Sequence, residues 1–223
     1  MSNPGTLDTD DMIEWEPAAA RTSSYFNAPD ADVTIRSSDN VYFKLHRKYL
    51  ECSTAAFPPA ELVTDAKEIV HLTEGGDTLE ILFQAIYPRP FPSLKDLKFD
   101  EIMLLAEAAE KYQVFSMIYA CKIHLREVLY PSCSSWCYDV SSLQSKRRQL
   151  LTHAVKHDDL EMVRELQPLL INIPLSEVAD ILPYESFKSW SLQREKFLIE
   201  ALGSKRARQL PVSTSNPIMA VLL

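Results

Sequence analysis

Residues 32–57 read DVTIRSSDNVYFKLHRKYLECSTAAF, and this stretch decides the fold. Val33 and Ile35 alternate with polar neighbours, and residues 41–45 alternate in the same way. The four residues 37–40 that separate the two runs have turn chemistry. Two short runs with a period of two, joined by a polar turn, predict a β-hairpin with one buried face.

The residues that follow the hairpin predict a short helix near 47–52 and a third short strand near 69–72. Beyond them the apolar residues recur with the period of a helix. Three helices are expected there, beginning at Asp77, Asp100 and Ser116, and the two aspartates are predicted to be N-caps. The first half of the chain therefore reads as a small sheet followed by paired helices.

A second, all-helical region is expected after a joint rich in serine and cysteine. Its helices are predicted over residues 143–157, 160–170, 174–183 and 184–202. Gly203 is predicted to be the C-cap of the last helix. The buried side of that helix is expected to include four residues: Phe187, Trp190, Phe197 and Leu198.

These patterns divide the chain into four segments. They predict a fold of the mixed α/β class, with the α+β arrangement. Residues 1–29 carry prolines and scattered acids, which predicts a disordered acidic N-terminal tail. Residues 30–130 are predicted to form the α/β domain, and residues 131–203 an all-helical extension. Residues 204–223 are predicted to be a flexible C-terminal tail.

The bulk composition narrows the class of protein. The chain has 223 residues and a formal net charge of −8, which opposes direct binding to the phosphate backbone of nucleic acids. Four cysteines are too few for a disulfide framework in a chain of this length, so a reducing compartment, cytoplasm or nucleus, is expected. No signal peptide and no stretch of about 18 apolar residues is present, so no membrane association is expected.

Several short motifs in the first half resemble the BTB/POZ domain family. Asp32-Val33-Thr34-Ile35 is similar to the first-strand signature of that family, and residues 43–47, FKLHR, are similar to the end of its second strand. Leu50 followed by Ser53 and Phe57 keeps the family's spacing, and residues 82–87 resemble the end of its central helix. The last third of the chain is similar to the helical extension of fungal BTB-domain proteins.

The resemblance implies a small β-sheet flanked by helical hairpins, and it implies recognition of protein partners, often as a homodimer. An acidic residue at the position of Asp32 and a basic residue at the position of Arg47 form a charged pocket near the dimer axis in that family. His46 and Leu50 belong to the same segment and complete the expected interaction residues. A charged pair of this kind is tolerated at an interface better than either charge alone.

The sequence therefore predicts a non-catalytic protein–protein interaction module that self-associates and presents its helical extension to a partner. No catalytic residues and no cofactor are expected, because no glycine-rich phosphate loop and no hydrolase elbow are present. One alternative is a substrate adaptor of a cullin-type ubiquitin ligase, with a cullin scaffold as partner. Residues 55–67 depart from the family pattern where such adaptors carry a hydrophobic patch, so this role stays second.

A third reading is a zinc-stabilised transcriptional regulator. Cys133, Cys137, His153 and His157 are spaced near the range of a zinc finger, and the two histidines share a helix face. The residues between the cysteines form no strand knuckle, and the segment that follows supplies no finger core. The preferred reading of this segment is a loop and an amphipathic helix without metal.

Overall fold

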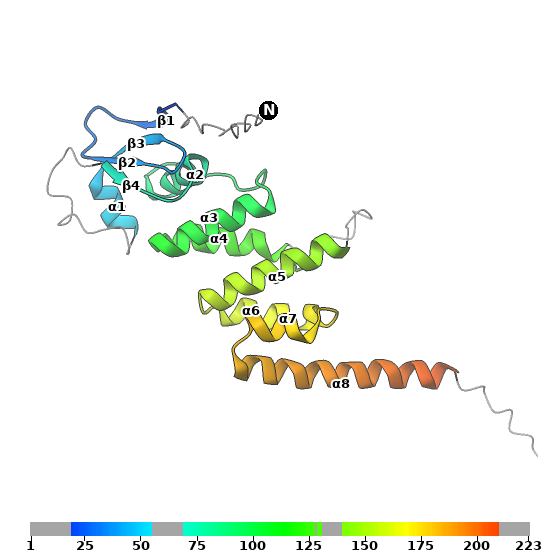
Figure 1. Ribbon diagram of the computed structural model, residues 1–223. Helices are drawn as coiled ribbons and strands as arrows, with labels where there is room; N and C mark the ends of the chain where they lie inside the picture. The colour runs from blue at the N-terminus through cyan, green and yellow to red at the C-terminus, as the bar shows by residue number, and fades with distance from the viewer. Residues whose placement is uncertain (1–18, 55–68, 128, 131–139, 210–223) are drawn as a thin grey trace, which may run out of the picture. The chain divides into compact units, whose positions relative to one another are not determined.

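The computed structural model describes residues 19–54, 69–127, 129–130 and 140–209 (Figure 1). The chain divides into two compact units, residues 1–121 and 122–223. The first unit combines a small mixed sheet with helices, which confirms the mixed α/β class. The second unit is helical over its described residues. The predicted domain ranges 30–130 and 131–203 stay predictions.

The described sheet has four short strands in the order β1-β3-β2-β4. They are β1 (Arg21–Asn27), β2 (Val33–Arg36), β3 (Val41–Leu45) and β4 (Ile69–His71). Strands β2 and β3 are antiparallel, with Val33 opposite Leu45, while β4 runs parallel to β2. The predicted hairpin and the predicted third strand are therefore confirmed.

Strand β1 corrects the interpretation of residues 1–29 as a disordered tail, which is wrong for residues 21–27. β1 pairs with β3 in parallel, and its register shifts between Thr22 and Asn27. Its two buried residues are Ser23 and Phe26, which are three apart, so the strand shows no period of two. The Ser23 hydroxyl accepts hydrogen bonds from the backbone N–H groups of Tyr25 and Phe26 and so organises this irregularity.

The core of the first unit joins the sheet to helix α2 (Gly76–Ile86). The phenyl rings of Phe43 and Phe83 lie 5.2 Å apart edge to face, and Phe26 lies 5.9 Å from Phe83. Phe43 and Phe83 are fully buried, and such ring pairs contribute about 0.5–1.5 kcal/mol beyond the burial of their area. These contacts hold α2 against β1 and β3.

A residue outside helix α2 caps its N-terminus, which corrects the prediction that Asp77 is its N-cap. The N-cap residue is Gly75, and the N–H of Gly76 donates a 2.7 Å hydrogen bond to the carboxylate of Asp39, in the β2–β3 turn. A Cβ at Gly76 would lie 2.5 Å from the side chain of Val41, so only glycine fits there. Asp77 lies in the first helical turn.

The remaining helices of the first half are α1 (Arg47–Ser53), α3 (Phe99–Tyr112) and α4 (Phe115–Arg126). Asp100 is in the first turn of α3 and is not its cap, since Lys98 is the N-cap residue and its backbone N–H donates a 2.6 Å hydrogen bond to the carboxylate of Glu101. Gln113 ends α3 in the left-handed region, with φ of 54°. All three helices occur where the sequence predicts helix.

The second unit holds α5 (Val140–Lys156), α6 (Leu160–Leu166), the 3-10 turn η2 (Gln167–Leu170), α7 (Leu175–Ile181) and α8 (Tyr184–Gln209). Asp159 caps α6 by accepting a hydrogen bond from the N–H of Met162. The first half of α8 is anchored by Trp190, which is 1% exposed and whose indole N–H donates to the carbonyl of Gln167 at 2.8 Å.

Three predictions about α8 are wrong. The helix runs through Gly203 to Gln209, so Gly203 is not a C-cap and residues 204–209 are not part of a flexible tail. Phe197 is 51% exposed and Leu198 is 38% exposed, so they do not belong to the buried side. Residues 210–223 lie outside the described part of the chain.

Candidate interaction site

The corner between β3 and α1 carries the predicted interaction residues. Asp32 is exposed just before β2, and its carboxylate accepts a 2.7 Å hydrogen bond from the backbone N–H of Arg47. Arg47 is the first residue of α1, so the acid satisfies one of the free N–H groups at that helix end. The structure thus brings Asp32 and Arg47 together through the backbone of the helix.

His46 lies between these two residues and is held from two sides. The Tyr87 hydroxyl accepts a 2.7 Å hydrogen bond from the His46 backbone N–H and lies 3.1 Å from His46 Nδ1. His46 Nε2 lies 3.3 Å from the carboxylate of Asp30. Burial raises the pKa of Tyr87, which keeps its hydroxyl protonated and able to bond at this corner. His46 is therefore a locally satisfied histidine at a strand-to-helix corner.

Leu50 faces inward from α1 and is 6% exposed, so its role is to fix α1 on the unit and not to touch a partner directly. Tyr49, which precedes it, packs its ring 4.6 Å from the ring of Tyr87. The corner thus offers Asp30, Asp32 and the partly exposed Arg47 to solvent on an aromatic base. Residues 55–67, on which the cullin alternative depends, lie outside the described residues.

The distal half of α8 carries a second surface, which the sequence did not predict. Leu192, Ile199 and Leu202 are 53%, 63% and 64% exposed. Ile199, Leu202 and Leu198 line a groove of about 360 Å³ together with Leu175 at the start of α7. Several large apolar side chains on one helix, exposed within their own unit, are typical of an interaction surface.

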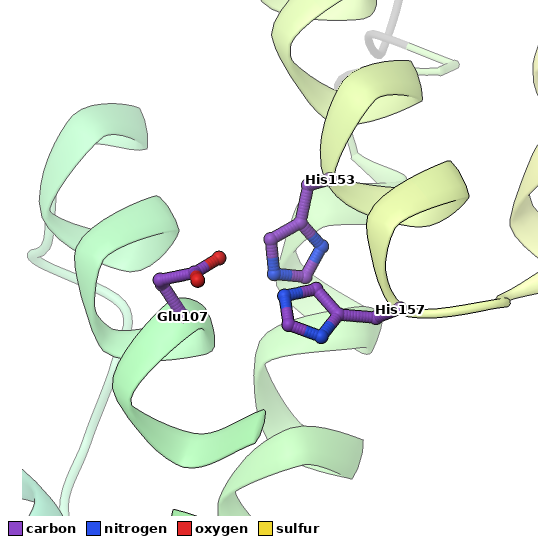
Figure 2. A group of neighbouring side chains, drawn as sticks. All are labelled: Glu107, His153 and His157. Carbon is purple, nitrogen blue, oxygen red and sulfur yellow. The ribbon is translucent and has the colours of Figure 1, made fainter. Parts of the chain in front are cut away.

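The candidate zinc residues are only partly described. Cys133 and Cys137 lie outside the described residues, so the four-residue set stays a prediction. His153 and His157 are neighbours at the end of α5, with ring centroids 4.6 Å apart (Figure 2). Glu107, also labelled in Figure 2, belongs to α3 in the first unit. The predicted sharing of one helix face by the two histidines is confirmed.

The two described thiols differ in their surroundings. Cys52 is exposed on α1. Cys121 is fully buried, and burial raises its pKa to about 12. A thiol held protonated in this way is a packing residue and a poor nucleophile.

Two features of this site escaped sequence reasoning for physical reasons. The bond between His46 and Tyr87 joins residues 41 apart, and no local spacing reveals it. The exposure of the distal part of α8 depends on which other elements pack against it, although five apolar residues among the six from Phe197 to Leu202 were a usable signal. Phe197 and Ile199 lie about 200° apart around the helix, so both cannot face one neighbouring element.

No protein-family model matches the chain, and no curated protein matches it. Among the described helices, none has an apolar stretch of the length that crossing a bilayer requires.

Proposed function

We propose that this chain is a non-catalytic protein-interaction module of the BTB/POZ type, acting in the cytoplasm or nucleus. Its first unit self-associates as a homodimer, and its helical second unit presents α8 to a different protein. The partner of α8 has an apolar groove that accepts one helix, which is a recurring mode of peptide recognition. The observation that carries this proposal is the exposed apolar segment of residues 197–202 in α8.

The segment 197–202 reads Phe-Leu-Ile-Glu-Ala-Leu and continues a helix whose anchor, Trp190, lies two turns earlier. Phe197 and Ile199 point to different sides of the helix at 100° per residue, and both are more than half exposed. Burying one such side chain fully contributes about 1.5–3 kcal/mol. A partner that covers two or three of them therefore gains several kcal/mol before the costs of association.

Self-association is supported by the order of elements and by the β3–α1 corner. The order of hairpin, short helix, strand and paired helices is the one that the BTB/POZ resemblance implies. Asp32 is exposed, Arg47 is partly exposed, and α1 presents both at one place. Opposite charges that meet across a dimer axis would set the register of the two copies more than the strength of their contact.

The test uses the full chain with two sets of variants. Ile199→Asp combined with Leu202→Asp places two charges on the α8 surface and is expected to weaken partner capture about tenfold or more. The matched control, Ser189→Asp with Gln193→Asp, adds the same charge at exposed polar positions of α8 and is expected to capture partners as the wild type does. Affinity purification with quantitative mass spectrometry measures the difference.

The same preparations report self-association through light scattering. Asp32→Asn keeps an oxygen that can accept from the N–H of Arg47 and removes the charge, so α1 stays capped. Both Asp32→Asn and Arg47→Gln are expected to lower the molar mass toward that of one chain, while the α8 variants keep the dimer mass. A dimer mass in both Asp32→Asn and Arg47→Gln would contradict the role of this charged pair, and a one-chain mass of the wild type would contradict the homodimer. Equal partner capture by the two α8 double variants would contradict the α8 surface.

A further inference from the structure

The end of α5 holds a pair of histidines that the proposed function does not use. His153 lies in the last turn of α5, and His157 follows directly after the helix ends at Lys156. Their ring planes are inclined by 47°, and a ring nitrogen of one lies within 4.8 Å of a ring nitrogen of the other. In Figure 2 both imidazoles project to the same side, and one nitrogen of each ring is turned toward the other ring.

The backbone that carries these two side chains is fixed by hydrogen bonds. The N–H of His157 donates to the carbonyl of His153 at 3.1 Å, so the helical spacing of the pair extends beyond the last residue of α5. The N–H of Asp159 then donates to the carbonyl of Ala154 at 2.8 Å, and Asp158 adopts the left-handed region with φ of 53°. This is a Schellman motif, which closes the helix end in one conformation.

The next helix holds the same corner from its other side. Asp159 caps α6 through the N–H of Met162, and its carboxylate lies 2.9 Å from the ammonium of Lys122. These two contacts hold the turn between the end of α5 and the start of α6. His157 is thus attached to a turn with little freedom to move.

We propose that His153 and His157 form a binding site for one divalent transition-metal ion, with zinc as the ion of choice. Imidazole nitrogens suit zinc, copper and nickel better than calcium or magnesium. Two histidines at positions i and i+4 of one helix face are the spacing that places two such nitrogens on one ion. Water fills the other positions around the ion, as at zinc sites with an open coordination position.

The geometry needs only a small adjustment of the side chains. Zinc binds histidine nitrogen at about 2.0–2.1 Å, so two nitrogens on a tetrahedral ion lie about 3.3 Å apart. The two ring nitrogens lie within 4.8 Å at present, and rotation of the imidazoles about their side-chain bonds closes the difference. No movement of the backbone is required, so little of the binding free energy is lost to ordering.

The electrostatics of the helix end also favour a cation. The last carbonyl groups of α5 give its C-terminus a partial negative charge, and both histidines lie within about one turn of it. The exposed carboxylate of Asp158 follows immediately. A divalent ion at this place meets a favourable field, which falls off within that same turn.

Zinc titration of the metal-free full chain by calorimetry tests this site. We expect one zinc ion per wild-type chain, and we expect His153→Ala and His157→Ala each to weaken binding at least about tenfold. His71→Ala and His124→Ala are the matched controls, because each removes one imidazole from elsewhere in the described chain, and both are expected to bind as the wild type does. Far-UV circular dichroism establishes that each variant keeps its helical content.

Three results would contradict the proposal. Binding that survives in both His153→Ala and His157→Ala places the zinc elsewhere. Absence of binding to the wild type removes the site. The double variant Cys133→Ser with Cys137→Ser is expected to retain the ion, and loss of zinc from it would show that two imidazoles do not suffice.

Discussion

Helices α2 and α8 both carry large apolar side chains and use them in opposite ways. Leu79, Leu82 and Phe83 on α2 are fully buried, and they lie on one face of the helix. Over residues 184–202 of α8, only Trp190 is buried to that degree, while Ile199 and Leu202 are more than 60% exposed. The apolar stripe of α2 is satisfied within its own unit, whereas exposed apolar side chains such as those of α8 are typical of a contact with a further surface.

The two helices also differ in how their ends are tied to the rest of their units. Asp39 caps α2 through the N–H of Gly76, and hydrogen bonds from Ser37 and Gly76 lower the pKa of Asp39 although partial burial opposes this. The anchored part of α8 is held by Trp190 and by Arg194, which donates to the carbonyl of Ile171 at 2.9 Å. These bonds hold the first three turns of α8, and the exposed segment of residues 197–202 lies beyond them.

A substitution of a buried ring on α2 is expected to have the greatest effect on stability. Phe83→Ala on α2 removes a fully buried ring from contact with Phe43 and Phe26 and is expected to lower the free energy of unfolding by about 3–5 kcal/mol. Ile199→Ala on α8 is expected to change it by no more than about 0.5 kcal/mol. Urea denaturation followed by circular dichroism measures both. Similar losses for the two variants would mean that α8 is packed within its own unit.

Within α8, substitutions in the anchored part and in the exposed part are expected to differ in their effect on stability. Trp190→Phe removes the indole N–H and leaves the carbonyl of Gln167 without that donor, which is expected to cost about 1–3 kcal/mol. Phe197→Leu reduces an exposed ring two turns later and is expected to be neutral within about 0.5 kcal/mol. Hydrogen exchange along α8 measures the difference. We expect exchange near residues 187–194 to be faster in Trp190→Phe and unchanged in Phe197→Leu.

Part of this architecture follows from the sequence because it depends on local patterns. Alternation over Val33–Arg36 and Val41–Leu45 predicted the hairpin, and helical spacing predicted α2. Strand β1 was missed because its inward residues, Ser23 and Phe26, have no strand period. The hydroxyl of Ser23 donates to Glu80 on α2, a contact that only the folded chain creates.

The candidate sites also include some features that the sequence predicted and others that it did not. The closeness of His153 and His157 follows from helical spacing alone, and so it was predicted. The cap of α2 was assigned wrongly because Asp39 reaches that helix end from 37 residues away, whereas the N-cap of α3, Lys98, lies only two residues before Asp100. Phe197 and Leu198 were predicted to belong to the buried side of α8, and both face away from the core of their unit. Which side of a helix is covered depends on the neighbouring elements, and no pattern within one helix contains that information.

The dependence of stability on pH is expected to be the weakest of these effects. It tests whether polar contacts stabilise the first unit as much as apolar contacts do. Glu74 precedes α2 and binds two residues of α3: Lys111 at 2.7 Å and the hydroxyl of Tyr112, which donates to it at 2.7 Å. Burial of Glu74 opposes its ionisation, but the hydrogen bonds from Lys111 and Tyr112 are stronger in sum and lower its pKa below the ordinary value of 4.5.

A carboxylate whose pKa is lowered on folding stabilises the protein fully above its unfolded pKa, and that contribution is lost as the pH falls through the lowered folded value. The stability of the wild type is therefore expected to decline below about pH 4.5, and Glu74→Gln is expected to decline less steeply there while being less stable at pH 7. Glu200→Gln removes the same formal charge from an exposed position of α8 and is expected to keep the wild-type decline. Urea midpoints between pH 3 and 7 measure the three slopes. If Glu74→Gln follows the wild type throughout, the tie between the α2 loop and α3 contributes nothing to stability, and the apolar stripe of α2 alone accounts for the difference from α8.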